Sequence, residues 1–129
     1  MDTEELITRA TEARENACAD YSRFQVGAAL AAASGKVYTG CNIENSTYGL
    51  TVCAERVALW KALSEGEREF TCIVVVASSK SPASPCGACR QLLWEFCGNL
   101  EVTLANLHGD RQTLRLEELL PRPFDRNSL

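Results

Sequence analysis

Two short stretches of the sequence combine residue types that can bind a metal ion and move protons. TVCAER contains Cys53, Glu55 and Arg56, and SPCGAC contains Cys86 and Cys89. On a helix Cys86 and Cys89 would share one face, and their C-x-x-C spacing suits two ligands of a single tetrahedral ion. Residues i and i+2 do not share a face inside a helix, so Cys53 and Glu55 can serve one site only if Cys53 lies at or near a helix cap. The motifs therefore predict a site at the starts of two helices.

The three cysteines of these motifs supply three sulfur ligands, and the sequence offers no obvious fourth. Structural zinc sites close with four protein ligands, whereas catalytic zinc sites leave one position for water. The alternative interpretation is that the cysteines are small buried hydrophobic residues, as free cysteines often are. For the SPCGAC pair this alternative is the weaker one, because two cysteines at ligand spacing beside a proline and a glycine suit an ion better than a core.

Hydrophobic periodicity and the residues that end helices and strands predict the elements that position these motifs. A turn at Ser34 and Gly35 indicates a hairpin, and a nearly continuous apolar run over 71–78 indicates a strand covered on both faces. We expect Thr51 and Ser84 to cap the second and third helices, with Pro85 in the first turn of the third. The expected helices are 2–19, 51–66, 81–98 and 116–120, and the expected strands are 24–33, 36–43, 71–78, 101–107 and 111–116.

This order of elements is typical of the α/β class. We expect a single three-layer domain over residues 1–129, in which a mixed five-stranded sheet carries helices on both faces. A chain of 129 residues is long enough for one such domain with a proper core and too short for two ordinary ones. The cysteines outside the two motifs are expected to pack within helices or strands; they are Cys18, Cys41, Cys72 and Cys97.

Composition and charge limit the partners of the chain. Hydrophobic residues make up 46% and charged residues 23%, as in folded proteins that work in water. The formal net charge is -4 and the pI about 5.0, which is not the footprint of a protein that binds a phosphate backbone. No apolar run is long enough for a membrane span, and acidic residues occupy the start of the chain, where a signal peptide would be apolar. The odd count of seven cysteines favours thiols and metal ligation over disulfides. We therefore expect a cytoplasmic protein with a small neutral ligand, and neither nucleic acid nor a membrane as a partner.

TVCAER and SPCGACRQ together strongly resemble the signature of the zinc-dependent cytidine deaminase family. YSRFQVGAAL, TGCNIENSTYG, SEGEREFTCIVVVA and LEELLPRPF are similar to segments of its small homotetrameric branch with three cysteine ligands, so the resemblance covers nearly the whole chain. It implies the cytidine deaminase-like fold, one Zn²⁺ per chain, and hydrolytic deamination of cytidine and deoxycytidine to uridine and deoxyuridine plus ammonia, as in pyrimidine salvage. It also implies a homotetramer whose pockets are shared between subunits.

The resemblance further implies how the motif residues divide the work. Cys53, Cys86 and Cys89 would bind the zinc, and Glu55 would be the proton shuttle, close to the metal without being a ligand. Three thiolates around Zn²⁺ leave a net charge of about -1, and a cation beside them would offset it. We expect Arg56 to supply that cation through contacts with Cys86 and Cys53.

The resemblance also implies substrate contacts. Those within one chain are ring stacking by Phe24, ribose binding by Asn42 and Glu44, and a backbone N–H from Ala54. Those that act across subunits are Ser46 and Tyr48, which would reach into a neighbouring pocket, and Phe124, which would cover the site from another chain. The structural alternatives are a core position for Phe24 and a polar turn for the Asn-x-Glu stretch.

Three other functions stay open. A non-catalytic zinc module would need a fourth protein ligand, for which Cys72 and Cys97 are candidates, because His108 is expected in a solvent-facing turn. A polynucleotide deaminase would need a basic groove, which the net charge does not indicate. An aminonucleoside-antibiotic deaminase of the blasticidin S type is the closest competitor, and Asn42 with Glu44, placed for a free ribose, favours a plain nucleoside.

Overall fold

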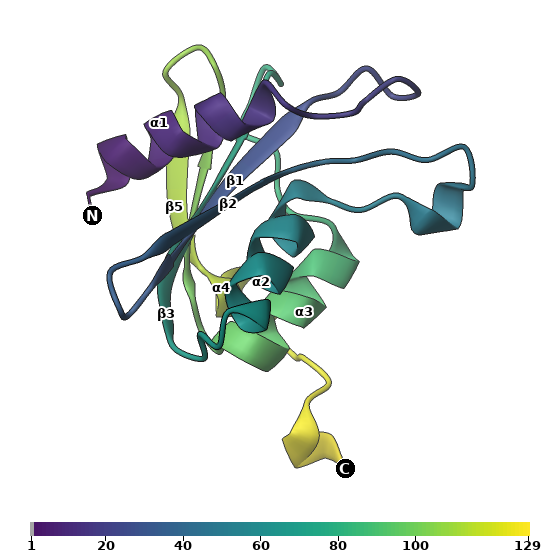
Figure 1. Cartoon of the computed structure of the whole chain (residues 1–129). Helices are drawn as coiled ribbons and strands as arrows, with labels where there is room; N and C mark the ends of the chain where they lie inside the picture. Colours follow the sequence, from purple (N-terminus) through teal and green to yellow (C-terminus); the bar gives the residue numbers. More distant parts are fainter. Residues whose placement is uncertain (1) are drawn as a thin grey trace.

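The computed structural model describes residues 2–129 and is built on a mixed five-stranded sheet (Figure 1). Its strand order is β2-β1-β3-β4-β5; β3 and β4 are parallel, and the other neighbouring pairs are antiparallel. The strands are β1 Val26–Ala32, β2 Val37–Cys41, β3 Phe70–Ala77, β4 Glu101–Ala105 and β5 Arg111–Arg115. The helices are α1 Thr3–Arg14, α2 Ala54–Ser64, α3 Gly87–Cys97 and α4 Leu116–Leu119, with short 3₁₀ helices η1 Tyr48–Leu50 and η2 Arg126–Ser128. The predicted α/β class and the order of elements are confirmed.

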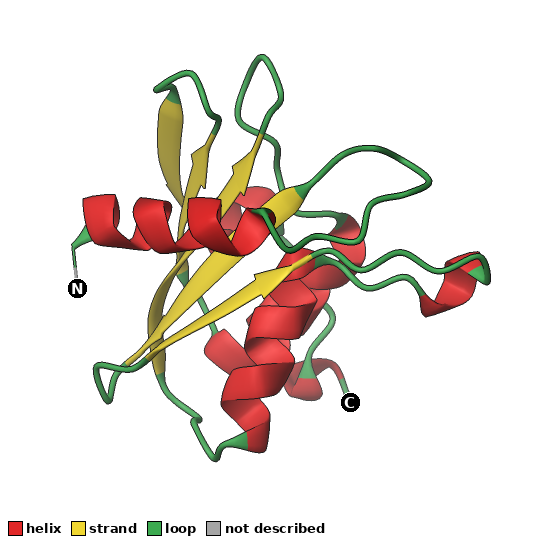
Figure 2. Ribbon diagram, turned by 45° about the horizontal axis from the view of Figure 1, so that its top comes forward, coloured by secondary structure: helices red, strands yellow, loops and turns green. Residues whose placement is uncertain are grey.

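The sheet is covered on both faces. Figure 2 shows α1 across one face, while α2 and α3 lie on the other. Along β3 the side chains alternate between two hydrophobic clusters: Val74 and Val76 pack with α1, and Ile73 and Val75 pack with the α2 and α3 side. A strand buried on both faces has no polar alternation, which explains the continuous apolar run in its sequence.

Two glycines allow these helices to lie close to the sheet. A Cβ added to Gly27 of β1 would stand 1.9 Å from the carbonyl oxygen of Ala10 in α1. A Cβ added to Gly40 of β2 would stand 2.5 Å from the carbonyl oxygen of Ala54 and 2.6 Å from the backbone nitrogen of Ala58, both in α2. Backbone cannot yield as a flexible side chain can, so each glycine sets the distance between one helix and the sheet.

The first helix ends at Arg14, five residues before the end expected from the sequence. Arg14 Nε donates to the carbonyl of Gln25 at 3.0 Å. Further on, the Cys18 N–H donates to the carbonyl of Asn42 at 3.0 Å, and the Glu44 N–H donates to the carbonyl of Cys18 at 2.8 Å. The N–H groups of residues 15–17 still bond to carbonyls three residues back, and from Cys18 onward contacts with a distant segment replace the helical bonds. Cys18 is exposed as a result, so the prediction that it packs within a helix or strand is wrong.

Among residues 2–129, no helix combines the length and the apolar character that crossing a bilayer requires.

Candidate active site

The three predicted cysteine ligands form one cluster. The Sγ atoms of Cys53, Cys86 and Cys89 all lie within 4.8 Å of one another, and the first two are 3.9 Å apart. Zinc with tetrahedral Zn–S bonds of about 2.3 Å would place its sulfur ligands about 3.8 Å apart, so the spacing fits this ion. Over residues 2–129, neither Cys72 nor Cys97 nor any other side chain that could bind a metal joins the group. The donor set therefore matches a zinc site with one coordination position left for a small molecule.

Two of the cysteines begin helices. Cys53 is the N-cap of α2 and Cys86 is the N-cap of α3, both with extended backbone conformations, and Cys89 follows in the first turn of α3. The sulfur atoms therefore gather where two helix N-termini meet, and each terminus is equivalent to about half a positive charge. This position favours thiolates, which are the metal-binding form of cysteine.

Thr51 and Ser84 do not cap these helices, contrary to the prediction. Thr51 Oγ1 accepts a hydrogen bond from the Asn45 N–H at 3.0 Å, and Ser84 Oγ accepts one from Arg90 Nη2 at 2.7 Å. The Thr51 hydroxyl is thus used by another segment and the Ser84 hydroxyl by the side chain of Arg90 in α3, and both helices begin only after the cysteines. Pro85 lies before the N-cap of α3 and not in its first turn.

The cysteine cluster is polarised internally. The neighbouring Cys89 thiol lowers the pKa of Cys53 to about 6, against an opposing effect of burial. The same interaction with Cys53, together with burial, raises the pKa of Cys89. Of these two thiols, Cys53 is therefore the one that ionises more easily.

Glu55 lies in the first turn of α2, next to the cluster but outside it. The residue is 5% exposed, and burial raises the pKa of its carboxyl to about 7, although the Glu55 backbone amide opposes the shift. A carboxyl group with a pKa near 7 can both accept and release a proton at neutral pH. Its position and environment suit a general acid and base.

Arg56 contacts the cluster through a different sulfur from the expected ones. Its Nη2 lies 3.9 Å from Cys89 Sγ, whereas the sequence predicted contacts with Cys86 and Cys53. Cys89 is 1% exposed and lies on the α3 side of the contact between α2 and α3, whereas Cys86 is exposed. Arg56 Nε is buried without a hydrogen-bond partner, so Nη2 is the guanidinium nitrogen that contacts the cluster.

A cavity of about 260 Å³ joins the cysteine cluster to the predicted substrate contacts. Its walls include the predicted substrate contacts Phe24, Asn42 and Glu44, together with Cys53, Ala54, Glu55 and Cys86. The cavity is close to the smaller end of the usual range for small-molecule sites. A reactive centre and a recognition surface therefore share one hollow.

Residues 1–104 match the family model described as "Cytidine and deoxycytidylate deaminase zinc-binding region". The chain belongs to the cytidine and deoxycytidylate deaminase family. It is 52% identical to a cytidine deaminase of Sporosarcina psychrophila over 100% of this chain and 96% of that protein. A cytidine deaminase of Burkholderia pseudomallei, solved by crystallography, is 49% identical with a TM-score of 0.94, over 96% of this chain and 100% of the other. The predicted family and fold are confirmed.

The antibiotic-deaminase alternative also finds a relative, at a greater distance. The blasticidin-S deaminase of Bacillus cereus is 33% identical over 95% of this chain and 92% of that protein. The higher sequence identity to cytidine deaminases favours a nucleoside over an aminonucleoside antibiotic as the substrate.

In this deaminase chain the Asn42 side chain is tied to the backbone on both sides of Phe24. Asn42 Nδ2 donates to the Phe24 carbonyl at 2.8 Å, and Asn42 Oδ1 accepts from the Val26 N–H at 2.9 Å. One N–H of the amide and one lone pair of its oxygen are left for a ligand. Phe24 is 37% exposed, so its ring is not a core residue.

Glu44 is tied to the loop that precedes Phe24. Its Oε1 accepts the N–H groups of Tyr21 and Ser22, each at 2.9 Å, and its Oε2 accepts the Ser22 hydroxyl. These hydrogen bonds, with that of the Ser22 hydroxyl as the largest cause, hold the pKa of Glu44 below its usual range. Sequence reasoning missed Ser22; its only signal was a serine two residues before the predicted stacking aromatic.

The three residues expected to act across subunits lie outside the cavity of their own chain. Tyr48 is 75% exposed on η1, with its ring centroid 6.0 Å from that of Tyr21, and Ser46 is exposed just before it. Phe124 is 64% exposed, and its carbonyl accepts a hydrogen bond from Gln91 Nε2. Figure 1 shows that η1 projects from the body on a long arm and that the C-terminal segment leaves it at another end.

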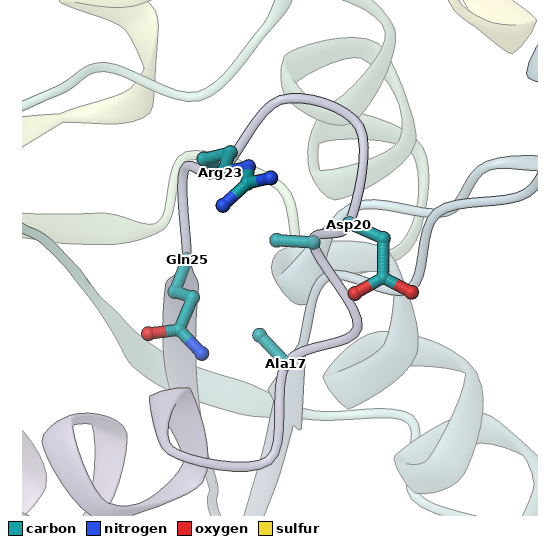
Figure 3. A pocket seen from close by; sticks show the side chains of 5 residues that line it. Ala17, Asp20, Arg23 and Gln25 are labelled. Carbon is teal, nitrogen blue, oxygen red and sulfur yellow. The ribbon is translucent and has the colours of Figure 1, made fainter.

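A second hollow, of about 440 Å³, lies in the loop between α1 and β1. Figure 3 shows the side chains of Ala17, Asp20, Arg23 and Gln25 around it. It shares no lining residue with the cavity at the cysteine cluster. It is open to solvent, and Asp20 and Arg23 are the only charged residues that line it, so it lacks a group of residues that could carry out catalysis.

Proposed function

We propose that the chain catalyses zinc-dependent hydrolytic deamination of cytidine and deoxycytidine to uridine and deoxyuridine, with release of ammonia. The observation that carries this proposal is the buried carboxyl group of Glu55 beside a cluster of three cysteines. The same cavity is lined by the Phe24 ring and by Asn42 and Glu44, two polar side chains that could bind a ribose. The family membership and the cytidine deaminases among the relatives support it.

The proposed roles follow from the chemistry of each side chain. Cys53, Cys86 and Cys89 would hold one Zn²⁺ per chain, and the bound ion would supply Lewis-acid activation of a water molecule. Glu55 would take a proton from that water and deliver protons to the ring nitrogen and to the departing amine, tasks that its pKa of about 7 allows. Arg56 would offset the negative charge of the thiolates.

On the substrate side, the cavity wall offers separate groups to the base and to the sugar. The Phe24 ring would stack on the pyrimidine, and the free backbone N–H of Ala54 in the first turn of α2 would bind its edge. Asn42 would donate its remaining N–H to a ribose hydroxyl, and Glu44 would accept from that hydroxyl. A ligand with both a flat base and a free sugar hydroxyl uses all four groups.

The rest of the proposal concerns the setting of the reaction. We place it in nucleoside salvage in the cytoplasm, because seven free cysteines suit a reducing compartment. We propose that residues 1–129 form one domain, and that four copies assemble into a homotetramer in which Ser46, Tyr48 and Phe124 complete neighbouring pockets. The exposed aromatic rings of Tyr48 and Phe124 support this arrangement.

The experiment measures zinc per chain and the ultraviolet absorbance change on incubation with cytidine. Deoxycytidine, blasticidin S and single-stranded DNA serve as comparison substrates. We expect about one zinc per chain, rapid conversion of both nucleosides, and little or no reaction with the other two. Faster turnover of blasticidin S would favour the antibiotic deaminase, and bound zinc without any turnover would favour a structural module.

A further inference from the structure

The backbone of Phe24, in the loop that precedes β1, is held by side chains and not by a neighbouring strand. The Phe24 carbonyl accepts from Asn42 Nδ2 at 2.8 Å, and the Phe24 N–H donates to Ser22 Oγ at 3.0 Å. Both backbone groups of the proposed stacking residue thus depend on side chains. Of the two side chains, only that of Asn42 has a role implied by the sequence motif.

The Ser22 hydroxyl joins the two recognition groups of the cavity. It donates its single proton to Glu44 Oε2 while it accepts the Phe24 N–H, and the residue lines the same cavity. A hydrogen bond to a carboxylate is stronger and better oriented than one between neutral groups. The Glu44 carboxylate and the backbone of Phe24 are therefore fixed relative to each other by one oxygen atom.

We propose that Ser22 is a positioning residue for substrate binding, whose hydroxyl sets the Glu44 carboxylate and the Phe24 ring at the distance that one nucleoside spans. This inference rests on the proposed function, in which Glu44 binds the sugar and Phe24 binds the base. Ser22 itself has no proton left to donate to a ligand, because a serine hydroxyl carries only one. It therefore acts through Glu44 and Phe24.

The hydrogen bonds of Glu44 show how little freedom the carboxylate retains. It accepts three hydrogen bonds from the loop: two at Oε1 from the N–H groups of Tyr21 and Ser22, and one at Oε2 from the Ser22 hydroxyl. A carboxylate has about four acceptor positions, so one position, on Oε2, is left for a ligand hydroxyl. Without the Ser22 hydroxyl, Oε2 loses the hydrogen bond that orients it, although Oε1 keeps its two, and the Phe24 N–H loses its acceptor.

The chain contains a matched control for this arrangement. In the turn between β1 and β2, Ser34 Oγ donates to Glu67 Oε2 at 2.7 Å and accepts the Lys36 N–H at 3.4 Å. Ser34 thus makes the same two kinds of bond as Ser22, from an exposed turn. This turn and the Phe24 loop lie at opposite ends of β1 (Figure 1). Removal of the Ser34 hydroxyl tests the general cost of such a bond without touching the cavity.

The experiment compares steady-state kinetics of Ser22→Ala, Ser22→Thr and Ser34→Ala with those of the zinc-loaded wild type, with cytidine as substrate. For Ser22→Ala we expect KM to rise roughly tenfold while kcat stays within about threefold, because the lost contacts bind substrate and transition state alike. Ser22→Thr keeps the hydroxyl and should restore most of the wild-type KM. Ser34→Ala should leave KM and kcat within about twofold of the wild type.

Amide hydrogen exchange provides a readout that does not depend on turnover. In Ser22→Ala the segment 19–25 should exchange faster while β3 is unchanged; in Ser34→Ala faster exchange should be confined to segment 33–37. A wild type that fails to deaminate cytidine would overturn the proposed function, and the exchange data would still test the loop. A KM of Ser22→Ala within twofold of the wild type, an equal KM change in Ser34→Ala, or unchanged exchange in 19–25 would overturn the role of Ser22.

Discussion

Glu55 concentrates the proposed chemistry in one side chain, since it is 5% exposed and its pKa is raised to about 7 by burial. Glu55→Gln keeps the shape of the residue but removes the proton that it would carry. We expect kcat for cytidine to fall roughly 10⁴-fold, at the upper end for loss of general acid and base catalysis, because one residue serves several transfers. Zinc content and the circular dichroism spectrum should match those of the wild type. A kcat within about tenfold of the wild type would exclude the assigned role.

Arg56 tests whether the charge of the cluster must be offset. Three thiolates around a divalent ion leave about -1, and replacement of one thiolate by a neutral imidazole removes that charge. Arg56 Nη2 lies 3.9 Å from Cys89 Sγ, so Arg56→Gln withdraws a cation from the centre. We expect turnover and zinc retention against a chelator to fall by roughly ten- to a hundredfold.

If charge is the reason for that loss, Cys53→His added to Arg56→Gln should recover much of it, because the neutral ligand removes what the arginine offset. The measurement is a double-mutant cycle on zinc content and turnover. Additive damage from the two substitutions would show that the arginine has another role, such as filling the space between α2 and α3.

At this scale the sequence was informative where chemistry demands fixed spacing. The three cysteines, Glu55 and the Asn-x-Glu pair could be proposed from motifs, and the structure brings them together at the cysteine cluster and the cavity beside it. The sulfur that Arg56 contacts could not be predicted, because it depends on how α2 packs against α3. Ser22 was missed for a related reason, since its partner Glu44 meets it only when the loop before β1 lies against the segment that follows β2.

At the scale of helices and strands, the distance between α2 and β2 determines the position of Glu55. Gly40 lies under the first turns of α2, and an added Cβ would meet the Ala54 carbonyl oxygen at 2.5 Å. Gly40→Ala should therefore move the N-terminus of α2 away from β2. Small displacements of catalytic groups are costly, so we expect kcat to fall roughly tenfold or more in the folded fraction, together with a loss of stability of about 1–3 kcal/mol.

Gly27→Ala is the control for this prediction, because it creates a clash of the same kind between β1 and α1, on the opposite face of the sheet. Thermal unfolding followed by circular dichroism should show that this variant is also destabilised, while kcat per folded, zinc-loaded chain stays within about threefold of the wild type. Equal losses of kcat in the two variants would mean that Gly40 contributes only to stability.

The elements themselves were predicted well in type and order, and less well at their ends. The continuous apolar run of β3 and the hairpin of β1 and β2 follow from local pattern alone. The start of α2 does not, because Thr51 Oγ1 is used by the Asn45 N–H and leaves the cap to Cys53. The end of α1 is likewise set by Cys18, whose backbone pairs with the segment that follows β2. In both cases a distant segment competes with the local preference.

For the whole molecule, composition indicated the class of partner but not the assembly. A net charge of -4 argues against a phosphate backbone as a ligand, whereas no feature of composition reports how many copies associate. The structure of one chain leaves Tyr48 and Phe124 exposed and away from their own cavity. If these rings complete pockets in neighbouring copies, mixtures of two different variants should differ in activity from the variants kept apart.

If Tyr48 completes the pocket of a neighbouring copy, two inactive variants should complement each other. Tyr48→Ala keeps Glu55, and Glu55→Gln keeps Tyr48, so a mixed assembly contains pockets with both intact groups. The two chains are dissociated and reassembled together in equal amounts. A restored pocket needs a Tyr48→Ala chain to supply Glu55 and a Glu55→Gln neighbour to supply Tyr48, so random mixing should return wild-type kcat/KM to roughly a quarter of the pockets. Light scattering should confirm the mass of a tetramer in each sample.

The matched control mixes the wild type with the double variant Tyr48→Ala, Glu55→Gln in the same way. Here every active pocket keeps its Glu55 from a wild-type chain, and the double variant supplies neither group, so the activity should fall below that of the same amount of wild type reassembled alone. Activity of the first mixture equal to the average of its two separate components would show that each chain completes its own pocket. In that case Tyr48 would leave its exposed position on η1 to reach the cavity of its own chain, or would have no part in binding.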